Sequence, residues 1–181
     1  MAYEIIVGVT GGVAAFKTAA LVSDLVQNDV GVTVVMTRAA TKFVGPATFR
    51  ALTGRPVNTR VFDGARFPLG AHIELARQAQ LLCIAPATAH FMAQAAHGLA
   101  DDLLSTILLS FTGPVVVAPA MNTEMWQKLS VQRNLQRLRD DGFHIVDPQS
   151  GWLSCRQQGI GRMAEPVEIK KVIGKLLKNT I

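Results

Sequence analysis

Pro119-Ala-Met-Asn122-Thr-Glu-Met-Trp126 is the stretch from which the fold of this chain can be predicted. The residues just before it, 114–118, are apolar, as in a buried strand. A helix is expected to begin near Thr123, so the chain passes from a strand directly into a helix. Open α/β sheets bind their ligands at such points. Asn122 is therefore expected at the carboxyl end of a strand, where its amide can both donate and accept hydrogen bonds.

Strand-like and helix-like segments alternate along the rest of the chain. The expected strands are apolar runs at residues 4–9, 30–36, 81–85, 114–118 and 143–146. The expected helices cover residues 13–27, 46–52, 72–78, 88–96, 101–110 and 123–140, and an amphipathic helix closes the chain at 169–177. Residues 148–163 show little periodicity and are predicted to form a long functional loop. The alternation predicts an α/β fold in which one domain, residues 1–181, contains a doubly wound, mainly parallel sheet.

The composition is that of a soluble globular protein. Of the 181 residues, 49% are hydrophobic and 17% are charged, which is typical of a chain with one buried core. The formal net charge is +5, but no run of Lys and Arg exceeds two residues. Nucleic-acid binding is therefore not predicted, whereas an anionic small-molecule ligand fits the charge. The nearly apolar segment 103–121 is interrupted by Ser105, Ser110 and Gly113-Pro114, so no membrane span is expected.

The two cysteines, Cys83 and Cys155, cannot build a disulfide framework or a zinc site alone. A reducing, cytoplasmic location without a metal site is therefore expected, and the N-terminus lacks the pattern of a signal peptide. Cys83 lies in an expected strand and is interpreted as a core residue. Cys155 lies between Ser154 and Arg156, where the neighbouring cation favours a thiolate; an ordinary loop thiol explains it equally well.

Glycines connect the first strand to the first helix in Gly8-Val-Thr-Gly11-Gly12. Such a turn lets backbone N–H groups approach a phosphate at the helix N-terminus, although tight packing of strand against helix also explains the glycines. The spacing is not that of dinucleotide-binding loops, and the second strand ends in Thr37-Arg38, without the acidic residue that holds an adenosine ribose. A mononucleotide is therefore favoured over NAD, while Arg38 leaves NADP open.

Three further polar residues each have a structural and a functional interpretation. Thr88 follows the third strand and is either a helix N-cap or part of a polar row along the edge of the sheet. His72 begins a helix after an irregular stretch, as a half-exposed capping residue or as a site residue. Asn122 is a capping residue or a ligand contact. The residues alone leave these alternatives open.

Five motifs in order resemble those of a known family: Gly11-Gly12-Val-Ala-Ala, Gly70-Ala-His72-Ile-Glu-Leu, Ala85-Pro-Ala-Thr88-Ala, Pro119-Ala-Met-Asn122-x-x-Met-Trp126 and Cys155-x-x-x-Gly-x-Gly161-Arg-Met163. Over essentially its whole length the chain is similar to the homo-oligomeric flavin-containing cysteine decarboxylases. The resemblance is greatest to the branch that converts 4′-phosphopantothenoylcysteine to 4′-phosphopantetheine in coenzyme A biosynthesis. It implies a Rossmann-like flavoprotein fold.

The resemblance also implies a cofactor, FMN, bound at the contacts of a trimer-based assembly, either a homotrimer or a dodecamer of trimers. The residues that it places around FMN are Gly11, Gly12, Val13, Thr37, Ala39, Thr88, Ala89 and Ala120. Asn122, His72 and Cys155 would converge on the flavin. A separate phosphopantothenate–cysteine ligase is implied as a possible partner, because that domain is often fused to the family.

The catalytic roles follow from the same resemblance. Asn122 would hold the carboxylate of a phosphorylated cysteine amide, and His72 would be the base or orienting group. Oxidation to a thioaldehyde would let CO2 leave, and Cys155 would protonate the resulting enethiol as it is reduced. Ser154, Arg156 and Met163 would line the substrate. Ser154-Cys155-Arg156 stands where the family has Ala-Cys-Gly, and His90 where it has Asn or Asp.

Two alternatives remain beside this interpretation. An enethiol-forming decarboxylase of peptides or other cysteine amides does not need Cys155 in the family pattern, so the presence of Cys155 favours the coenzyme A branch. A regulatory homologue that binds FMN without turnover is the second alternative. The intact set of His72, Asn122 and Cys155 argues against it.

Overall fold

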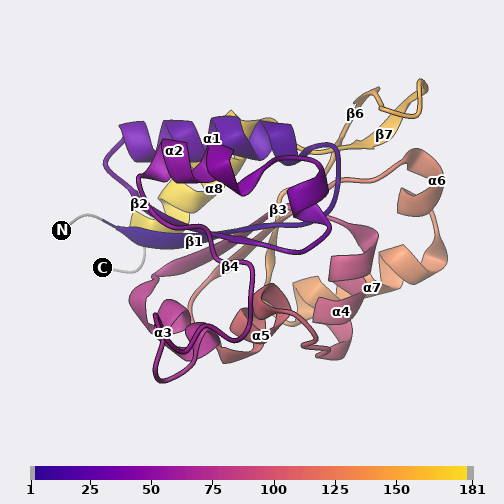
Figure 1. Ribbon diagram of the computed structural model, residues 1–181. Helices are drawn as coiled ribbons and strands as arrows, with labels where there is room; N and C mark the ends of the chain where they lie inside the picture. The colour runs from indigo at the N-terminus through magenta and orange to yellow at the C-terminus, as the bar shows by residue number, and fades with distance from the viewer. Residues whose placement is uncertain (1–2, 179–181) are drawn as a thin grey trace.

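The computed structural model describes residues 3–178 as a parallel sheet between two layers of helices (Figure 1). The sheet strands are β1 (Glu4–Val9), β2 (Gly31–Met36), β3 (Leu81–Ala87), β4 (Val115–Pro119) and β5 (His144–Ile145). The helices are α1 (Ala15–Gln27), α2 (Pro46–Thr53), α3 (Ala71–Gln78), α4 (Ala89–His97), α5 (Leu103–Ser110), α6 (Thr123–Trp126), α7 (Leu129–Asp140) and α8 (Pro166–Lys178), with a 3-10 turn at Ala40–Lys42. The doubly wound α/β fold is confirmed.

The strand order β2-β1-β3-β4-β5 places a topological switch point between β1 and β3. All four pairings are parallel. The chain leaves β1 toward β2 on one side and returns to β3 on the other, so the loops after β1 and β3 diverge. A crevice forms at the carboxyl ends of the strands at such a point.

The core has two halves, one on each face of the sheet. Helices α1, α2 and α8 pack on one face and α3, α4, α5 and α7 on the other (Figure 1). The closing helix follows its predicted pattern, since Ile169, Ile173 and Leu177 are buried. All seven residues of β3 are buried, which explains why the strand is a continuous apolar run.

The prediction of an irregular loop at residues 148–163 is wrong. The segment forms an antiparallel hairpin of β6 (Gln149–Trp152) and β7 (Gln158–Arg162), which projects beyond the end of the sheet (Figure 1). Most of its residues are exposed on both faces, so the alternation of polar and apolar residues that marks a half-buried strand is missing. Its strands are specified by pairing and by contacts to distant segments.

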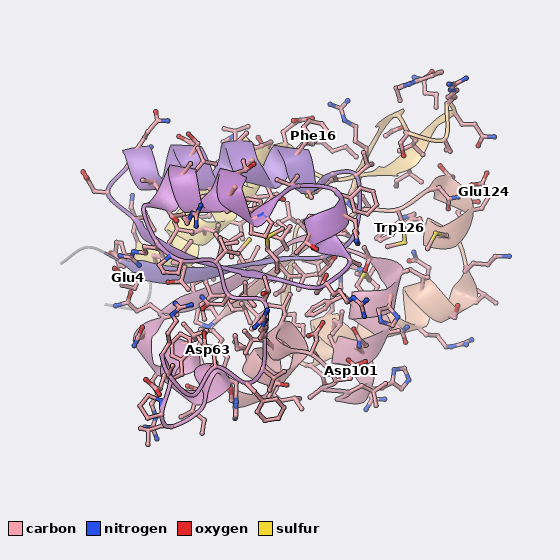
Figure 2. The ribbon with its side chains drawn as sticks, viewed as in Figure 1. Glu4, Phe16, Asp63, Asp101, Glu124 and Trp126 are labelled. Carbon is pink, nitrogen blue, oxygen red and sulfur yellow. The ribbon has the colours of Figure 1, made fainter. Side chains whose placement is uncertain are left out.

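The prediction of one helix over residues 123–140 is also wrong. The helix is interrupted at Gln127 and Lys128, and Lys128 has an extended backbone (φ −63°, ψ 132°). The Gln132 side chain donates to the Trp126 carbonyl at 2.6 Å, which satisfies one group freed by the break. Trp126 is buried, whereas Glu124 on the same short helix points to solvent (Figure 2).

Candidate active site

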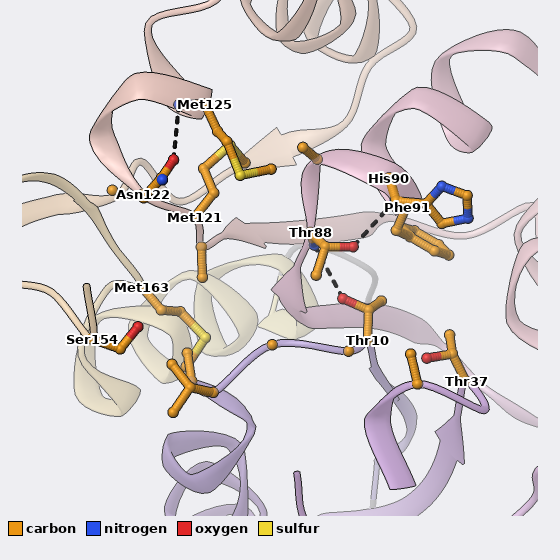
Figure 3. A pocket seen from close by; sticks show the side chains of 18 of the residues that line it. Thr10, Thr37, Thr88, His90, Phe91, Met121, Asn122, Met125, Ser154 and Met163 are labelled. Atoms are coloured by element: carbon orange, nitrogen blue, oxygen red, sulfur yellow. Dashed lines mark hydrogen bonds between the residues drawn. The ribbon is translucent and has the colours of Figure 1, made fainter. Parts of the chain in front are cut away.

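A cavity of about 1000 Å³ lies at the carboxyl ends of β1, β3 and β4 (Figure 3). Its walls come from the loops after β1, β2, β3 and β4 and from the β6–β7 hairpin. This volume is at the upper end of the roughly 300–1,000 Å³ that is typical of small-molecule sites. Phe16, on the first turn of α1 (Figure 2), is 64% exposed and also lines the cavity.

The loop after β1 forms one end of the cavity. Gly11 is required there, because a Cβ on it would lie 2.3 Å from the Cβ of Ala39 in the loop after β2. No side chain caps the N-terminus of α1, and its first turn contains no acidic residue. The Gly12 N–H donates to the Thr10 carbonyl at 2.9 Å, and the helix dipole and the other uncapped N–H groups of this turn are available to an anion.

A row of threonine hydroxyls joins the ends of β1 and β3. Thr10 Oγ1 donates to the Pro86 carbonyl at 2.7 Å and accepts from the Thr88 backbone N–H at 3.0 Å. Thr88 Oγ1 accepts from the Phe91 N–H at 3.3 Å and so caps α4 (Figure 3). Thr88 thus has both of its predicted roles, as N-cap and as part of the cavity wall.

Asn122 caps α6 and also faces the cavity. Its Oδ1 accepts from the Met125 N–H at 2.9 Å, as the dashed line in Figure 3 shows. One of the two lone pairs of the side-chain oxygen is therefore used, and the Nδ2 group, with two donors, remains for a ligand. The cap fixes the direction of the amide, so this position favours a ligand group that accepts hydrogen bonds.

The β6–β7 hairpin is attached to the Asn122 segment through its backbone. The Met121 N–H donates to the Gly161 carbonyl at 3.0 Å, and Thr123 Oγ1 donates to the Ile160 carbonyl at 2.9 Å. A Cβ at Gly159 would lie 2.2 Å from Thr123 Oγ1. A Cβ at Gly161, whose φ is +135°, would lie 2.2 Å from the Met121 carbonyl oxygen. Only glycines allow this close approach.

A buried lysine attaches the hairpin to α1. Lys17 Nζ donates to the Met163 carbonyl at 2.6 Å and to Glu165 Oε1 at 3.0 Å. Arg162 Nη2 donates to the same Glu165 oxygen at 2.8 Å. Burial lowers the pKa of Lys17, the hydrogen bond to Glu165 partly restores it, and the charge of Arg162 lowers it further.

Most of the predicted site residues lie together on the cavity wall. Those that line it are Gly11, Gly12, Val13, Thr37, Ala39, Thr88, Ala89, Ala120, Asn122, Ser154 and Met163. They come from segments up to 152 positions apart in the sequence, Gly11 to Met163. The parallel sheet brings together the residues that follow β1, β2, β3 and β4, because these strands end at one edge, and the β6–β7 hairpin segment adds Ser154 and Met163.

Cys155 and Arg156 lie on the turn of the hairpin and are exposed, outside the cavity wall. The Arg156 N–H donates to the Leu153 carbonyl at 2.9 Å, and Arg156 has a left-handed backbone (φ 62°). Glycine adopts this conformation without strain, which explains its use at this position in the family motif. The other cysteine, Cys83, is buried, and burial raises the pKa of its thiol to about 12.

His72 lies on the first turn of α3, against α5 and away from the cavity wall of its own chain. Its carbonyl accepts from Ser110 Oγ at 3.4 Å. Its Nδ1 is buried without a hydrogen-bond partner among residues 3–178. The expected convergence of His72, Asn122 and Cys155 is therefore not found within a single chain: of the three, Asn122 alone lines the cavity.

Lys17 and Arg162 were missed as site residues. Lys17 lies four positions before the buried Leu21, on the core side of α1, and this spacing was the available signal. Arg162 lies inside the motif Gly161-Arg-Met163, but no pattern distinguishes it from a solvent-facing arginine. His90, at the start of α4, also lines the cavity.

No helix within residues 3–178 is long and apolar enough to cross a membrane. Across the same described range, no cluster of three or more His, Cys, Asp and Glu side chains is placed to hold a metal ion.

Comparisons with known proteins place the chain in a family. The family model described as Flavoprotein matches residues 1–178. The coenzyme A biosynthesis bifunctional protein CoaBC of Vibrio cholerae is 43% identical over 166 residues, which cover 92% of this chain and 42% of that protein. CoaBC of Bacillus subtilis is 42% identical over 172 residues, covering 95% and 42%. The chain thus spans less than half the length of these relatives.

Solved structures show the same fold. A PPC decarboxylase mutant in complex with pantothenoylaminoethenethiol has a TM-score of 0.87 and 29% identity, covering 98% of this chain and all of that one. The FMN-dependent cysteine decarboxylase SpaF has a TM-score of 0.83 and 33% identity, covering 98% and 96%. The expected resemblance is confirmed: the chain belongs to the Flavoprotein family, whose members include FMN-dependent cysteine decarboxylases.

Proposed function

We propose that the chain is an FMN-dependent decarboxylase that converts 4′-phosphopantothenoylcysteine to 4′-phosphopantetheine in coenzyme A biosynthesis. The relatives named for coenzyme A biosynthesis and the PPC decarboxylase structure support this substrate. The observation that carries the proposal is the orientation of Asn122. Asn122 lines the cavity, and because its Oδ1 accepts from the Met125 N–H, its Nδ2 group is left to donate to a substrate carboxylate.

The residues of the cavity fit FMN. Gly11, Gly12 and Val13, before the uncapped N-terminus of α1, would hold its phosphate. Thr88, Ala89 and Ala120 would lie along its ring system, and small residues there leave room for a flat ring. When bound, FMN supplies the two-electron oxidation and reduction that a cysteine side chain cannot perform alone.

The chain's own groups would bind the substrate and move its protons. Asn122 would hold the substrate carboxylate until CO2 leaves. Because the Asn122 amide is neutral, it would not oppose the loss of the carboxylate's negative charge from this position. Cys155 would donate a proton to carbon of the enethiol intermediate, and the two electrons taken up earlier by the cofactor would be returned to complete the reduction to the saturated thiol. Since Cys155 lies on the exposed turn, that turn would have to fold over the cavity when substrate binds, while the strands of the hairpin stay attached.

A second copy of the chain would supply the base. His72 does not line the cavity of its own chain, so a trimer in which His72 reaches the cavity of a neighbour reconciles the motif with the geometry. Mixing His72→Asn and Asn122→Asp chains tests this. Each variant alone should be inactive, and co-assembled chains should regain partial activity, because some sites combine an intact His72 with an intact Asn122. No recovery in a verified mixed trimer would place both residues on one chain.

The experiment that tests the function is mass spectrometry of the product formed from 4′-phosphopantothenoylcysteine by FMN-loaded protein. Loss of CO2 alone supports the proposal. The matched variant Cys155→Ser should stop at a product that has lost CO2 and two hydrogens. Wild-type protein that leaves the substrate unchanged, with flavin bound, would contradict the function and favour a non-catalytic FMN-binding homologue.

A second candidate is an enethiol-forming decarboxylase of peptidyl or other cysteine amides. Two observations favour it: Cys155 lies outside the cavity wall, and SpaF, an FMN-dependent cysteine decarboxylase, is 33% identical. In that case the wild-type product would already lack CO2 and two hydrogens, and Cys155→Ser would not change it.

A further inference from the structure

The hairpin wall of the cavity carries more positive than negative charge. Lys17 and Arg162 both bind a single oxygen of Glu165, at 3.0 and 2.8 Å. One carboxylate therefore faces two cations, and one of them, Lys17, has only 7% of its side chain exposed. A half-buried cluster with this imbalance is stabilised by a second anion.

The rest of the cavity does not supply that anion. The basic side chains of Lys17, Arg38 and Arg162 line it, and among the described residues Asp102 is the one acidic residue that does so. The Asp102 carboxylate is already used, since its Oδ1 accepts from the backbone N–H and the hydroxyl of Ser105 at the start of α5. An anionic ligand in the cavity would supply the second negative charge at this wall.

Arg162 is held in a fixed position on this wall. Glu165 binds its Nη2, and its Cδ and Nη1 lie against Gly151 of the neighbouring strand, where a Cβ would be 3.3 Å from each. Gly151 thus leaves space for the arginine, and Glu165 directs it. With Nη2 bound to Glu165, the other N–H groups of the guanidinium can bind an oxyanion.

We propose that Arg162, supported by Lys17 and Glu165, binds the terminal phosphate of the substrate. The inference rests on the proposed function and extends it, because it explains how the site selects a phosphorylated cysteine amide. The phosphate of FMN has the same chemistry, but the backbone groups at Gly11–Val13 are expected to hold it. The hairpin, whose exposed turn carries Cys155 outside the cavity wall, is the side from which substrate is expected to enter.

The test compares Arg162→Met with wild-type protein on 4′-phosphopantothenoylcysteine and on pantothenoylcysteine, which lacks the phosphate. For the phosphorylated substrate, kcat/KM should fall roughly 10- to 100-fold, the range expected for one charge-assisted hydrogen-bonded contact. For the unphosphorylated substrate it should not change. Arg162→Lys, which keeps the charge but loses the planar fork, should recover part of the loss.

The control is Arg139→Met, which removes an exposed arginine paired with Asp147 at 2.6 Å on α7, away from the cavity. It should behave as wild type with both substrates. An equal loss on both substrates with Arg162→Met would overturn the proposal in favour of a purely structural role. Titrations with FMN and riboflavin separate the two phosphates: if Arg162→Met weakens FMN binding but not riboflavin binding, the anion is that of the cofactor and the proposal fails.

A binding titration distinguishes failure of this inference from failure of the proposed function. FMN-loaded wild-type protein should bind 4′-phosphopantetheine more tightly than pantetheine, and Arg162→Met should remove the difference. If wild-type protein turns over neither substrate, the proposed function is wrong, and this titration still decides the role of Arg162. Equal affinities of wild type and variant for 4′-phosphopantetheine would overturn it.

Discussion

The five-stranded sheet and the β6–β7 hairpin are held in place by opposite means. The sheet is fixed by its side chains, since every residue of β3 and β4 is buried between two layers of helices. In β7 Gly161 alone is buried, and the hairpin is fixed by hydrogen bonds to its backbone carbonyls. The difference separates stability from chemistry: the sheet supports the fold, and the hairpin sets the shape of one cavity wall.

The largest effect on stability is expected in the sheet. Ile84→Ala should reduce the free energy of unfolding by about 3 kcal/mol, because Ile84 is fully buried and its removal leaves a cavity. Urea unfolding followed by circular dichroism measures the change. Flavin binding per folded molecule should be retained. A loss below about 1 kcal/mol would mean that the sheet tolerates voids and that its buried side chains do not hold it in place as strongly as expected.

A smaller loss of stability with a large loss of activity is expected in the hairpin. Gly161→Ala places a Cβ against the Met121 carbonyl at an unfavourable φ, so the hairpin must shift. The expected cost is about 2 kcal/mol, and turnover should fall on the order of 100-fold, because the cavity wall is displaced.

The matched control for that variant is Gly174→Ala. Nothing lies within 4 Å of a Cβ at Gly174, in the interior of α8. This substitution should raise stability by about 0.5–1 kcal/mol and leave turnover unchanged. If Gly161→Ala behaved like Gly174→Ala in both stability and turnover, the position of the hairpin would not depend on close contact between its backbone and Met121.

The smallest effect is expected at the two cysteines. Cys155 is exposed on the hairpin and should react rapidly with a thiol reagent at pH 8. Cys83 should not react in the folded protein, because it is buried and its raised pKa, about 12, keeps it protonated. Modification of Cys155 should change stability by less than about 0.5 kcal/mol. Reaction of Cys83 at the same rate would show that the sheet opens.

Ionisation of Cys83 also makes the free energy of unfolding decrease at alkaline pH. In the unfolded chain the thiol ionises near its ordinary pKa of 9.0, whereas in the folded chain it stays protonated to about 12. The contribution of Cys83 to the free energy of unfolding is therefore fully present below pH 9, and it is lost as the pH rises from 9 toward 12. In Cys83→Ala this part of the alkaline loss should disappear from the unfolding free energy.

The sequence was sufficient for the sheet and for the cavity residues that follow its strands. Strands buried on both faces must be apolar runs, and parallel strands must end at one edge, so the pattern places Thr88 and Asn122 at the same edge of the sheet, whereas Ala120 came from the family resemblance. These predictions depend on patterns that are local in sequence.

The hairpin, Lys17 and Arg162 could not be predicted in this way. Gln149–Trp152 and Gln158–Arg162 have no buried face that would leave a periodic pattern. The burial of Lys17 depends on a carbonyl and a carboxylate almost 150 positions away. The position of His72 outside the cavity depends on which face α3 turns to the sheet, and no local pattern in the sequence specifies that face.

A hairpin held by its carbonyls can change its side chains without losing its place. The Ile160, Gly161 and Met163 carbonyls bind Thr123, Met121 and Lys17, whatever side chains stand on the turn. The side chains at positions 154 and 156–158 can therefore change while the hairpin keeps its position. A library confined to those positions, with Leu153, Cys155, Gly159 and Gly161 kept, is a practical starting point for testing other cysteine amides as substrates.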